Sequence, residues 1–375
     1  MKLSMLIYFL LCSFFCSAQN SYLFAGTYTG SGSKGIYVYN FNSQTGKATW
    51  VSNTDSVINP SFVTVSPDGN YVYAVNETHG PDPGKVSAFS FDKENGSLKF
   101  LNSELTGGDD PCHLTLSNDV KWLFVANYSS GNASAFPVNG DGSLQPYTQL
   151  LQDSGTGANK ARQEKAHVHE TVFSPDYKYL FTPDLGTDKI MIYKFNSSLK
   201  QPLSPALNKY TSVTPGSGPR HLTFYPNKKY AYLINELTGD VVVFNYNDGK
   251  LKEIQKILAH PKDFKGVIGS AEIIISPDGK FLYASNRGDE NNLAIFSIDA
   301  ATGKLTLNGY QPTLGKAPRS FVIDPTGDYL LAANQDSDNV VIFKINKQTG
   351  LLTSTGEEIH VPKPVCLQMV KIKTD

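Results

Sequence analysis

The sequence has little cysteine, no excess of charge and one long apolar run. Its 375 residues include 4 cysteines, and 33 Lys plus Arg balance 34 Asp plus Glu. This balance argues against the basic surface that attracts nucleic acid, so we expect no nucleic-acid partner. Cys112 and Cys366 lie outside the apolar run. They could pair in an exported protein, but two small buried thiols are the simpler expectation.

Common motifs of hydrolases are also missing, and the one nucleotide-binding pattern lacks its structural context. The chain has no G-x-S-x-G elbow and no H-E-x-x-H motif, so neither a serine esterase nor a zinc protease is indicated. His167 and His169 could be two metal ligands, but no third ligand is evident, and we expect no metal or other cofactor. Residues 30–35 fit G-x-G-x-x-G, yet a strand-like run follows where a dinucleotide site needs a helix.

The apolar run lies within residues 1–18. Lys2 precedes it, and the small residues Ser17 and Ala18 end it. This order is typical of a cleavable signal peptide, so we expect an exported protein, periplasmic or extracellular. Cys16 raises the alternative of a lipoprotein anchor, which the bulky residues before it make less favourable. The run is too short to span a membrane, and no other segment is apolar enough.

A turn motif divides the rest of the chain into similar units. Ser66-Pro67-Asp68-Gly69 separates two alternating apolar runs, and related turns follow at spacings of 51, 57, 51, 51 and 48 residues. The related turns begin at Ser117, Ser174, Tyr225, Ser276 and Asp324. Two more strand-like runs complete each unit. Four antiparallel strands in about 50 residues are the unit of a propeller blade.

The two ends of the chain supply a seventh unit. Residues 22–28 resemble the second strand of a blade, and residues 365–370 resemble its missing first strand. Pairing these runs would close the ring and remove exposed sheet edges. We therefore expect an all-β fold, a seven-bladed β-propeller closed by strands from both termini. Residues 19–375 would form its single domain, and we expect a monomer.

In such a ring the first strand of each blade lines the central channel, and the end of the second strand lies beside it. Counting five residues back from each turn places Ser61, Cys112, His169, Arg220, Ala271 and Arg319 at one mouth of the channel. The second strands mostly end in Asn, which we expect to tie blade ends together through backbone hydrogen bonds. The residues after these ends include Glu77, Tyr128, Glu236, Arg287 and Gln335. Strand alternation should turn His113 and His221 away from His169 and Arg220, which favours a supporting role for both.

The charged residues at this mouth have a limited chemistry. Two or three arginines suit a carboxylate or phosphate, because a guanidinium donates two parallel hydrogen bonds. An arginine aimed at a carbonyl oxygen would stabilise the charge that develops when water attacks an ester. His169 or Glu236 could take the proton from that water, and the sequence leaves this choice open. We expect Arg319 to support substrate binding, with Tyr128 and Gln335 either touching substrate or packing. A purely structural polar network is the alternative.

Longer motifs carry a resemblance over essentially the whole mature chain. They are Asp110-Pro111-Cys112-His113, His167-Val168-His169, Gly218-Pro219-Arg220-His221, residues 230–237, Tyr283-Ala284-Ser285-Asn286-Arg287 and Pro318-Arg319-Ser320-Phe321. In these the chain resembles the bacterial propeller type of 6-phosphogluconolactonase, and its fold is similar to that of fungal muconate-lactonizing enzymes.

The resemblance implies hydrolysis of a sugar-type lactone without a metal. It places the acting groups on His169, Arg220, Glu236 and Arg287. The family's usual substrate is a cytoplasmic sugar phosphate, so the expected export leaves the substrate open, including whether it carries a phosphate. A lactone-forming cycloisomerase and a non-catalytic binding propeller are the alternatives.

Overall fold

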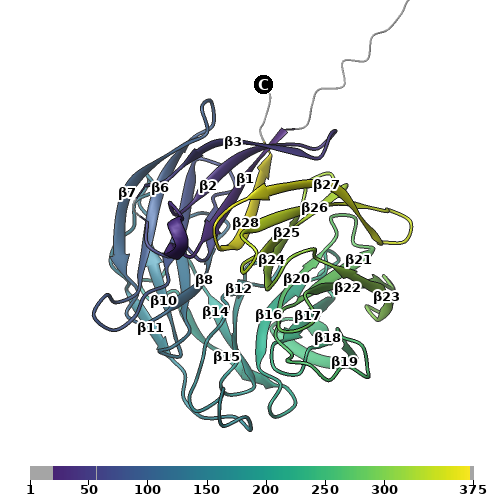
Figure 1. The fold of residues 1–375 in the computed structure, drawn as a ribbon. Coiled ribbons are helices and arrows are strands. Elements are labelled where there is room, and N and C mark those ends of the chain that lie inside the picture. The colour runs from purple at the N-terminus through teal and green to yellow at the C-terminus, as the bar shows by residue number, and fades with distance from the viewer. Residues whose placement is uncertain (1–19, 56, 372–375) are drawn as a thin grey trace, which may run out of the picture.

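Seven four-stranded antiparallel sheets surround a central channel (Figure 1) in the computed structural model, which describes residues 20–55 and 57–371. This confirms the predicted seven-bladed β-propeller. We number the blades along the chain. Blade 1 is β28-β1-β2-β3, and blades 2 to 7 contain β4–β7, β8–β11, β12–β15, β16–β19, β20–β23 and β24–β27. The predicted signal peptide lies outside the described residues.

The strands follow one another along the chain with short connections. Blades 1 to 3 contain β1 (Asn20–Thr27), β2 (Tyr37–Asn42), β3 (Lys47–Asn53), β4 (Val63–Val65), β5 (Tyr71–Asn76), β6 (Lys85–Asp92), β7 (Ser97–Leu105), β8 (Pro111–Leu116), β9 (Trp122–Asn127), β10 (Asn132–Pro137) and β11 (Gln149–Gln152). Blades 4 and 5 contain β12 (Val172–Phe173), β13 (Tyr179–Asp184), β14 (Lys189–Phe195), β15 (Leu203–Ser212), β16 (Pro219–Phe224), β17 (Tyr230–Asn235), β18 (Asp240–Asn247) and β19 (Lys250–Leu258). The remaining strands are β20 (Ser270–Ile275), β21 (Phe281–Asn286), β22 (Asn292–Ile298), β23 (Leu305–Pro312), β24 (Pro318–Ile323), β25 (Tyr329–Asn334), β26 (Asn339–Ile345), β27 (Leu352–His360) and β28 (Pro364–Lys371).

The described part of the chain contains one helical element, the short 3-10 turn η1 (Gly30–Gly32). It occupies the predicted loop over residues 30–35, where the sequence also fits a dinucleotide-binding pattern. In the same described part, no helix has the length and apolar character needed to cross a membrane.

Blade 1 joins the two ends of the described chain. β28 pairs antiparallel with β1, from Ser21 opposite Lys371 to Thr27 opposite Pro364. β28 also packs against the inner strands of both neighbouring blades, β24 and β4. The predicted closure is therefore confirmed, and the last strand of the chain occupies the channel side of the first blade.

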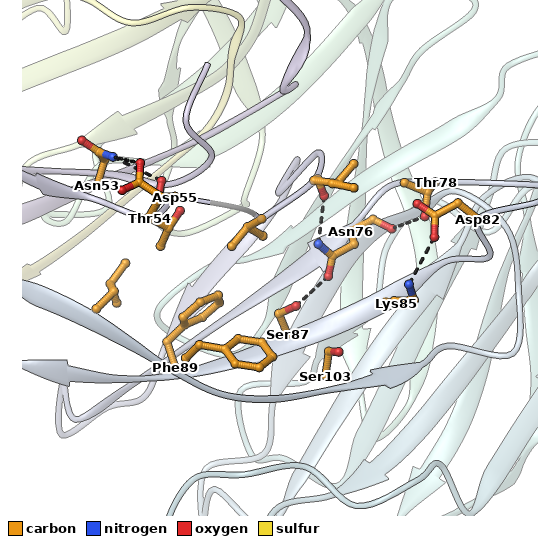
Figure 2. A pocket seen from close by; sticks show the side chains of 14 residues that line it. Asn53, Thr54, Asp55, Asn76, Thr78, Asp82, Lys85, Ser87, Phe89 and Ser103 are labelled. Carbon is orange, nitrogen blue, oxygen red and sulfur yellow. Dashed lines mark hydrogen bonds and ion pairs between the residues drawn. The ribbon is translucent and has the colours of Figure 1, made fainter. Parts of the chain in front are cut away.

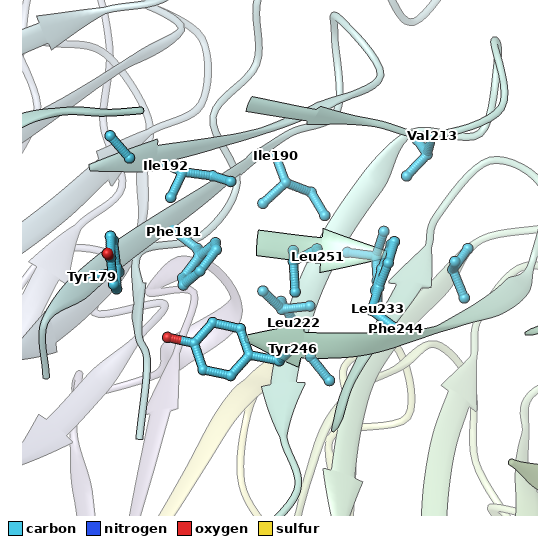
Figure 3. Packing of buried hydrophobic residues seen from close by; sticks show 13 residues of the cluster. Tyr179, Phe181, Ile190, Ile192, Val213, Leu222, Leu233, Phe244, Tyr246 and Leu251 are labelled. Atoms are coloured by element: carbon cyan, nitrogen blue, oxygen red, sulfur yellow. The ribbon is translucent and has the colours of Figure 1, made fainter. Parts of the chain in front are cut away.

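Apolar side chains fill the spaces between adjacent blades. In the cluster between blades 4 and 5, Phe181 and Ile192 face Leu233 and Phe244 (Figure 3). All four side chains are buried. Burial of large apolar side chains is the main favourable term in folding, so each blade depends on its neighbours for its core. The flat faces of the sheets are thereby covered all around the ring.

Asparagines at the ends of second strands join neighbouring blades, as the sequence predicts. Their Nδ2 atoms donate to backbone carbonyls in the segment that connects the preceding blade. The pairs are Asn76 with Ile58, Asn127 with Thr106, Asn286 with Ala259, and Asn334 with Thr313. Asn235 differs, because its Nδ2 donates to the Asp240 carboxylate within the same blade. These bonds satisfy buried carbonyls beside the channel mouth.

Both cysteines of the propeller are buried free thiols, as expected. The Sγ of Cys366, on β28, accepts a hydrogen bond from the backbone N–H of Val63 in blade 2. Cys112 Sγ lies 3.4 Å from the carbonyl of His169 in blade 4. Each thiol therefore contacts the blade next to its own.

We predict that deleting residues 362–375 prevents soluble folding, because blade 1 would lose its channel strand and expose the edge of β1. The control deletes residues 372–375 alone, since β28 ends at Lys371. Soluble yield and thermal melting of the two truncations check the prediction. A melting temperature of the longer deletion equal to that of the full chain would refute the closure.

Candidate active site

Bulges at the starts of the inner strands set the direction of the predicted site residues. In β8, β16, β20, β24 and β28 the register with the second strand of the blade shifts near the strand's beginning. The residues at the shifts are Cys112, Arg220, Ala271 with Glu272, Arg319, and Val365. A bulge places two residues opposite one, so consecutive side chains stop alternating.

The bulges correct the expectation about His221. Arg220 Nη1 lies 3.2 Å from Nε2 of His221, so both side chains point into the channel. The His221 ring packs 5.2 Å from the His169 ring and 5.3 Å from the His113 ring. Alternation therefore does not turn His221 away from His169 and Arg220, because the bulge cancels it. The rings of His113 and His221 form a layer below the mouth.

Glu236 is the centre of the upper layer. It follows β17, and its backbone N–H donates to the carbonyl of Gly218. Its Oε1 accepts from Arg162 at 2.6 Å, and its Oε2 lies 3.1 Å from Arg220 Nε and 2.9 Å from Arg287 Nη2. The carboxylate is thus held by three guanidinium groups, from the loop before blade 4, from blade 5 and from blade 6.

This arrangement fixes the charges of the group. Burial alone would raise the pKa of Glu236, but Arg287, Arg220 and Arg162 outweigh it and lower the pKa to about 2. Burial lowers the pKa of Arg220 to about 10, with Arg287 and Arg319 adding to the effect. Glu236 is therefore ionised and Arg220 charged at neutral pH. Both carboxylate oxygens of Glu236 bind guanidinium groups, so Glu236 serves to hold the arginines in position.

Arg319 and Glu77 lie beside blade 1. The Arg319 guanidinium stands over the Tyr28 ring, 5.7 Å from its centroid, and its Nη2 is 3.9 Å from Glu77 Oε2. Tyr28 donates its hydroxyl to Glu77 Oε1 at 2.8 Å. Burial raises the pKa of Tyr28, so this hydroxyl keeps its proton at neutral pH. Glu77 thus has one firm hydrogen bond and one loose ionic contact.

His169 is buried between Cys112 and Tyr128. Its Nδ1 is 3.9 Å from Cys112 Sγ, and the Tyr128 ring meets it edge-on at 5.5 Å. Burial, and next Arg220, lower the pKa of His169 well below its usual value. The imidazole is therefore neutral at physiological pH. It can donate or accept a hydrogen bond, but an imidazolium here would face several guanidinium groups.

These side chains surround a cavity of about 180 Å³. It is lined by Glu77, Cys112, Tyr128, Arg162, His169, Glu236, Arg287 and Arg319. Five of the predicted site residues (Tyr128, His169, Glu236, Arg287 and Arg319) therefore line one cavity. Arg220 lies directly behind it, bound to Glu236 and to the carbonyl of Ala271 at 2.6 Å. Gln335 is half-buried, is not among the lining residues, and contacts Asp336 at 3.3 Å.

Sequence reasoning missed Arg162 as a site residue. It lies in the loop between β11 and the strand segment of His169, and the 57-residue spacing there marks an insertion. The buried Gln163 amide anchors this loop by donating to Leu185 O and Asp188 Oδ1, both at 2.8 Å. Arg162 can then reach Glu236 and the Tyr128 hydroxyl. The long spacing indicates an insertion in the sequence, but it does not show which residue of the insertion reaches the site.

A second titratable layer lies deeper in the channel. His221 Nδ1 pairs with Glu272 Oε1 at 2.9 Å, and Phe62 packs on His113 at 4.0 Å between ring centroids. Burial raises the pKa of Glu170 well above its usual value, so this carboxyl is protonated. The layer lies beneath the cavity. Burial would raise the pKa of Glu272, but His221 and Arg220 outweigh it and lower the pKa, so the layer also holds a carboxylate beneath the arginines.

The composition of the cavity bears on cofactors. Within residues 20–55 and 57–371, no group of three or more His, Cys, Asp or Glu side chains is placed to hold a metal ion. The cavity's carboxylates face arginines, and its donors are guanidinium groups, an imidazole and a phenol. Such donors suit an organic anion.

A larger groove of about 480 Å³ lies on the side of the ring, between blades 1 and 2. Its polar groups mostly satisfy one another: Ser87 donates to Asn76, and Lys85 pairs with Asp82 (Figure 2). Phe89 and neighbouring apolar side chains form its floor. Because its charges are already paired and it is far less basic than the channel mouth, we assign the chemistry to the mouth.

We predict that Glu236→Gln lowers the free energy of unfolding by about 3–5 kcal/mol at pH 7, because three guanidinium groups lose their buried counter-charge. Glu236 has a lowered pKa of about 2, so its stabilisation is complete above its ordinary pKa near 4.5 and is lost as pH falls toward 2. The deficit of the variant should therefore shrink at acidic pH. Urea unfolding at pH 7 and pH 3.5 measures it, with exposed Glu253→Gln as control. Equal stability at pH 7 would show that the cluster needs no carboxylate.

Comparison with known proteins agrees with the propeller fold. Residues 22–369 match the family model described as "Lactonase, 7-bladed beta-propeller". A 6-phosphogluconolactonase of Formosa agariphila is 42% identical over 92% of this chain and 99% of its own length, and one of Bacillus subtilis is 36% identical over 92% and 97%. The solved structure of a periplasmic gluconolactonase of Pseudomonas aeruginosa has a TM-score of 0.90 at 36% identity, covering 94% of this chain and 100% of that one. The chain belongs to the seven-bladed β-propeller lactonase family.

Proposed function

We propose that this protein hydrolyses an anionic sugar-type lactone in the cavity at the channel mouth. The observation that carries the proposal is the charge of the site. Four guanidinium groups (Arg162, Arg220, Arg287 and Arg319) stand around two carboxylates, Glu236 and Glu77. The surplus of positive charge in a partly buried cavity attracts and orients an anion. The names of the relatives support lactone hydrolysis over the alternatives of lactone formation and simple binding.

The size of the cavity favours a small substrate. Pockets for drug-sized ligands measure about 300–1,000 Å³, whereas this cavity measures about 180 Å³. One sugar-sized ring with its substituents suits such a volume, and the open mouth leaves room for an acidic group. The substrate we propose is therefore a monosaccharide lactone that carries a carboxylate or phosphate.

The arginines have separate tasks in this proposal. Arg287 and Arg319 line the cavity, and both are partly exposed to it. One guanidinium would hold the substrate's acidic group, and the other would stabilise the oxyanion that forms when water adds to the lactone carbonyl. Glu236 also lines the cavity, Arg220 lies behind it, and their contact keeps the guanidinium groups close together. His169, neutral and buried, would donate or accept a hydrogen bond at the ring oxygen.

Two considerations support the proposed setting of the reaction. The predicted signal peptide and the periplasmic gluconolactonase of Pseudomonas aeruginosa both favour an exported enzyme. Outside the cytoplasmic membrane a sugar phosphate is scarce, so a lactone with a carboxylate fits the proposed location better. We keep the monomer and the relation to muconate-lactonizing enzymes as predictions.

We predict turnover of at least one sugar lactone, with an acidic lactone preferred over its neutral counterpart. The assay follows proton release with a pH indicator, subtracts spontaneous hydrolysis, and compares phosphorylated, carboxylated and neutral lactones. Absence of turnover with every lactone, together with tight binding of another protein, would favour the binding propeller.

On the lactone so identified, we predict that substitutions of Arg287 and Arg319 have different kinetic effects. Substitution by Ala of the arginine that binds the substrate's anionic group should raise KM and leave kcat nearly unchanged. The arginine at the oxyanion should lower kcat by about 10²–10³. Arg287→Ala and Arg319→Ala are compared, with Arg287→Lys and Arg319→Lys keeping the charge without its two-pronged geometry. Near-normal kcat/KM in both Ala variants would show that the reaction does not take place in this cavity.

A further inference from the structure

The cavity contains two carboxylates in very different surroundings. Glu236 binds three guanidinium groups and is 7% exposed, whereas the Glu77 side chain is 17% exposed and also lines the cavity. Glu77 Oε1 accepts the Tyr28 hydroxyl, and Oε2, which is itself buried, accepts no hydrogen bond from the described residues. Arg319 Nη2, at 3.9 Å, is beyond hydrogen-bond distance of Oε2. Glu77 is therefore the carboxylate with unused acceptor capacity.

The backbone holds Glu77 firmly in place. Its N–H donates to the carbonyl of Asn59, and Asn59 Nδ2 donates to the carbonyl of Glu77, both at 3.0 Å. Blade 2 presents the residue opposite Glu236, which belongs to blade 5, three blades away around the ring. A substrate ring between them would have Glu236 and its arginines on one side, and Glu77 with Arg319 on the other. The terminal torsion of a glutamate is broad, so the carboxylate can turn toward a bound water.

The other two candidate bases are less suitable. Glu236 has both oxygens occupied by guanidinium groups, and losing its charge would leave those groups uncompensated. His169 would become an imidazolium beside Arg220 in a buried position. A proton on Glu77, in contrast, removes a negative charge next to the weakly held Arg319 and leaves the three-arginine cluster intact.

We propose that Glu77 is the general base of this lactonase, a role that rests on the proposed function. The Glu77 carboxylate takes one proton from water as the water oxygen bonds to the lactone carbonyl carbon. The carbonyl π electrons move to oxygen and form the oxyanion that an arginine holds. The tetrahedral intermediate then reforms the carbonyl and breaks its bond to the ring oxygen. That oxygen takes the proton back from Glu77, and the product is the open hydroxy acid, which ionises.

The test is Glu77→Gln in the full chain, on the lactone that the wild-type protein hydrolyses. The glutamine amide oxygen can still accept the Tyr28 hydroxyl, so the fold should persist, and thermal melting checks this. Loss of a general base should lower kcat by about 10²–10⁴. KM should stay the same or fall, because the cavity becomes more positive. A structural role would instead raise KM and lower the melting temperature.

Two further measurements make the assignment specific. Glu77→Ala leaves room for a small carboxylate, so added formate should restore part of kcat in a concentration-dependent way, while Glu77→Gln should not respond. Glu290→Gln is the matched control, a half-buried glutamate outside the cavity with one buried oxygen unpaired, and should keep wild-type kcat.

The outcomes separate the two proposals. If the wild-type protein hydrolyses no lactone, the proposed function fails and the base fails with it. If the wild-type protein is active but Glu77→Gln keeps kcat within threefold, the lactonase stands and Glu77 is not the base. A large loss of kcat without rescue of Glu77→Ala by formate, accompanied by a raised KM, would also overturn the assignment.

Discussion

The site depends on one buried ionic cluster, the contact of Glu236 with Arg162, Arg220 and Arg287. Like charges this close would repel strongly in a medium of low dielectric constant. A single carboxylate whose two oxygens reach all three guanidinium groups makes the arrangement possible. The residues come from blades 5 and 6 and from the loop before blade 4, so the cluster also bonds the ring together at its mouth. The contacts between Glu236 and the arginines thus both stabilise the fold and position the side chains of the site.

The propeller scaffold explains why such a cluster can form at all. The inner strands begin at the mouth, and bulges in β8, β16, β20, β24 and β28 direct consecutive side chains into the channel. Asn76, Asn127, Asn286 and Asn334 satisfy the carbonyls of the connecting segments, so the backbone needs nothing from the site residues. The charged side chains are then free to face one another and the cavity. Interblade apolar packing supplies the stability that a charged centre would otherwise reduce.

The sequence contains enough information to predict the ring but not the details of its mouth. The recurring turns and the split seventh unit predict the blades and their closure, because strands, turns and channel positions all follow one repeat. The positions of His169, Arg220, Glu236, Arg287 and Arg319 follow from the same count. The direction of the His221 side chain does not follow from the repeat. A bulge interrupts the alternation of side chains in β16, and the sequence pattern does not show where a bulge occurs. Arg162 was missed because an insertion follows no repeat, and only the fold shows where its loop returns.

Glu77 shows the same limit from another side. The repeat places it at the mouth as the equivalent of Glu236, since each follows an asparagine at the end of a second strand. Equivalent positions in a ring nevertheless meet different neighbours: Glu236 meets guanidinium groups from both sides, while Glu77 meets a phenol and one distant arginine. A symmetric scaffold can in this way give two identical side chains separate tasks. The carboxylate that is fully paired gathers the arginines, and the one that is partly free is left to move a proton.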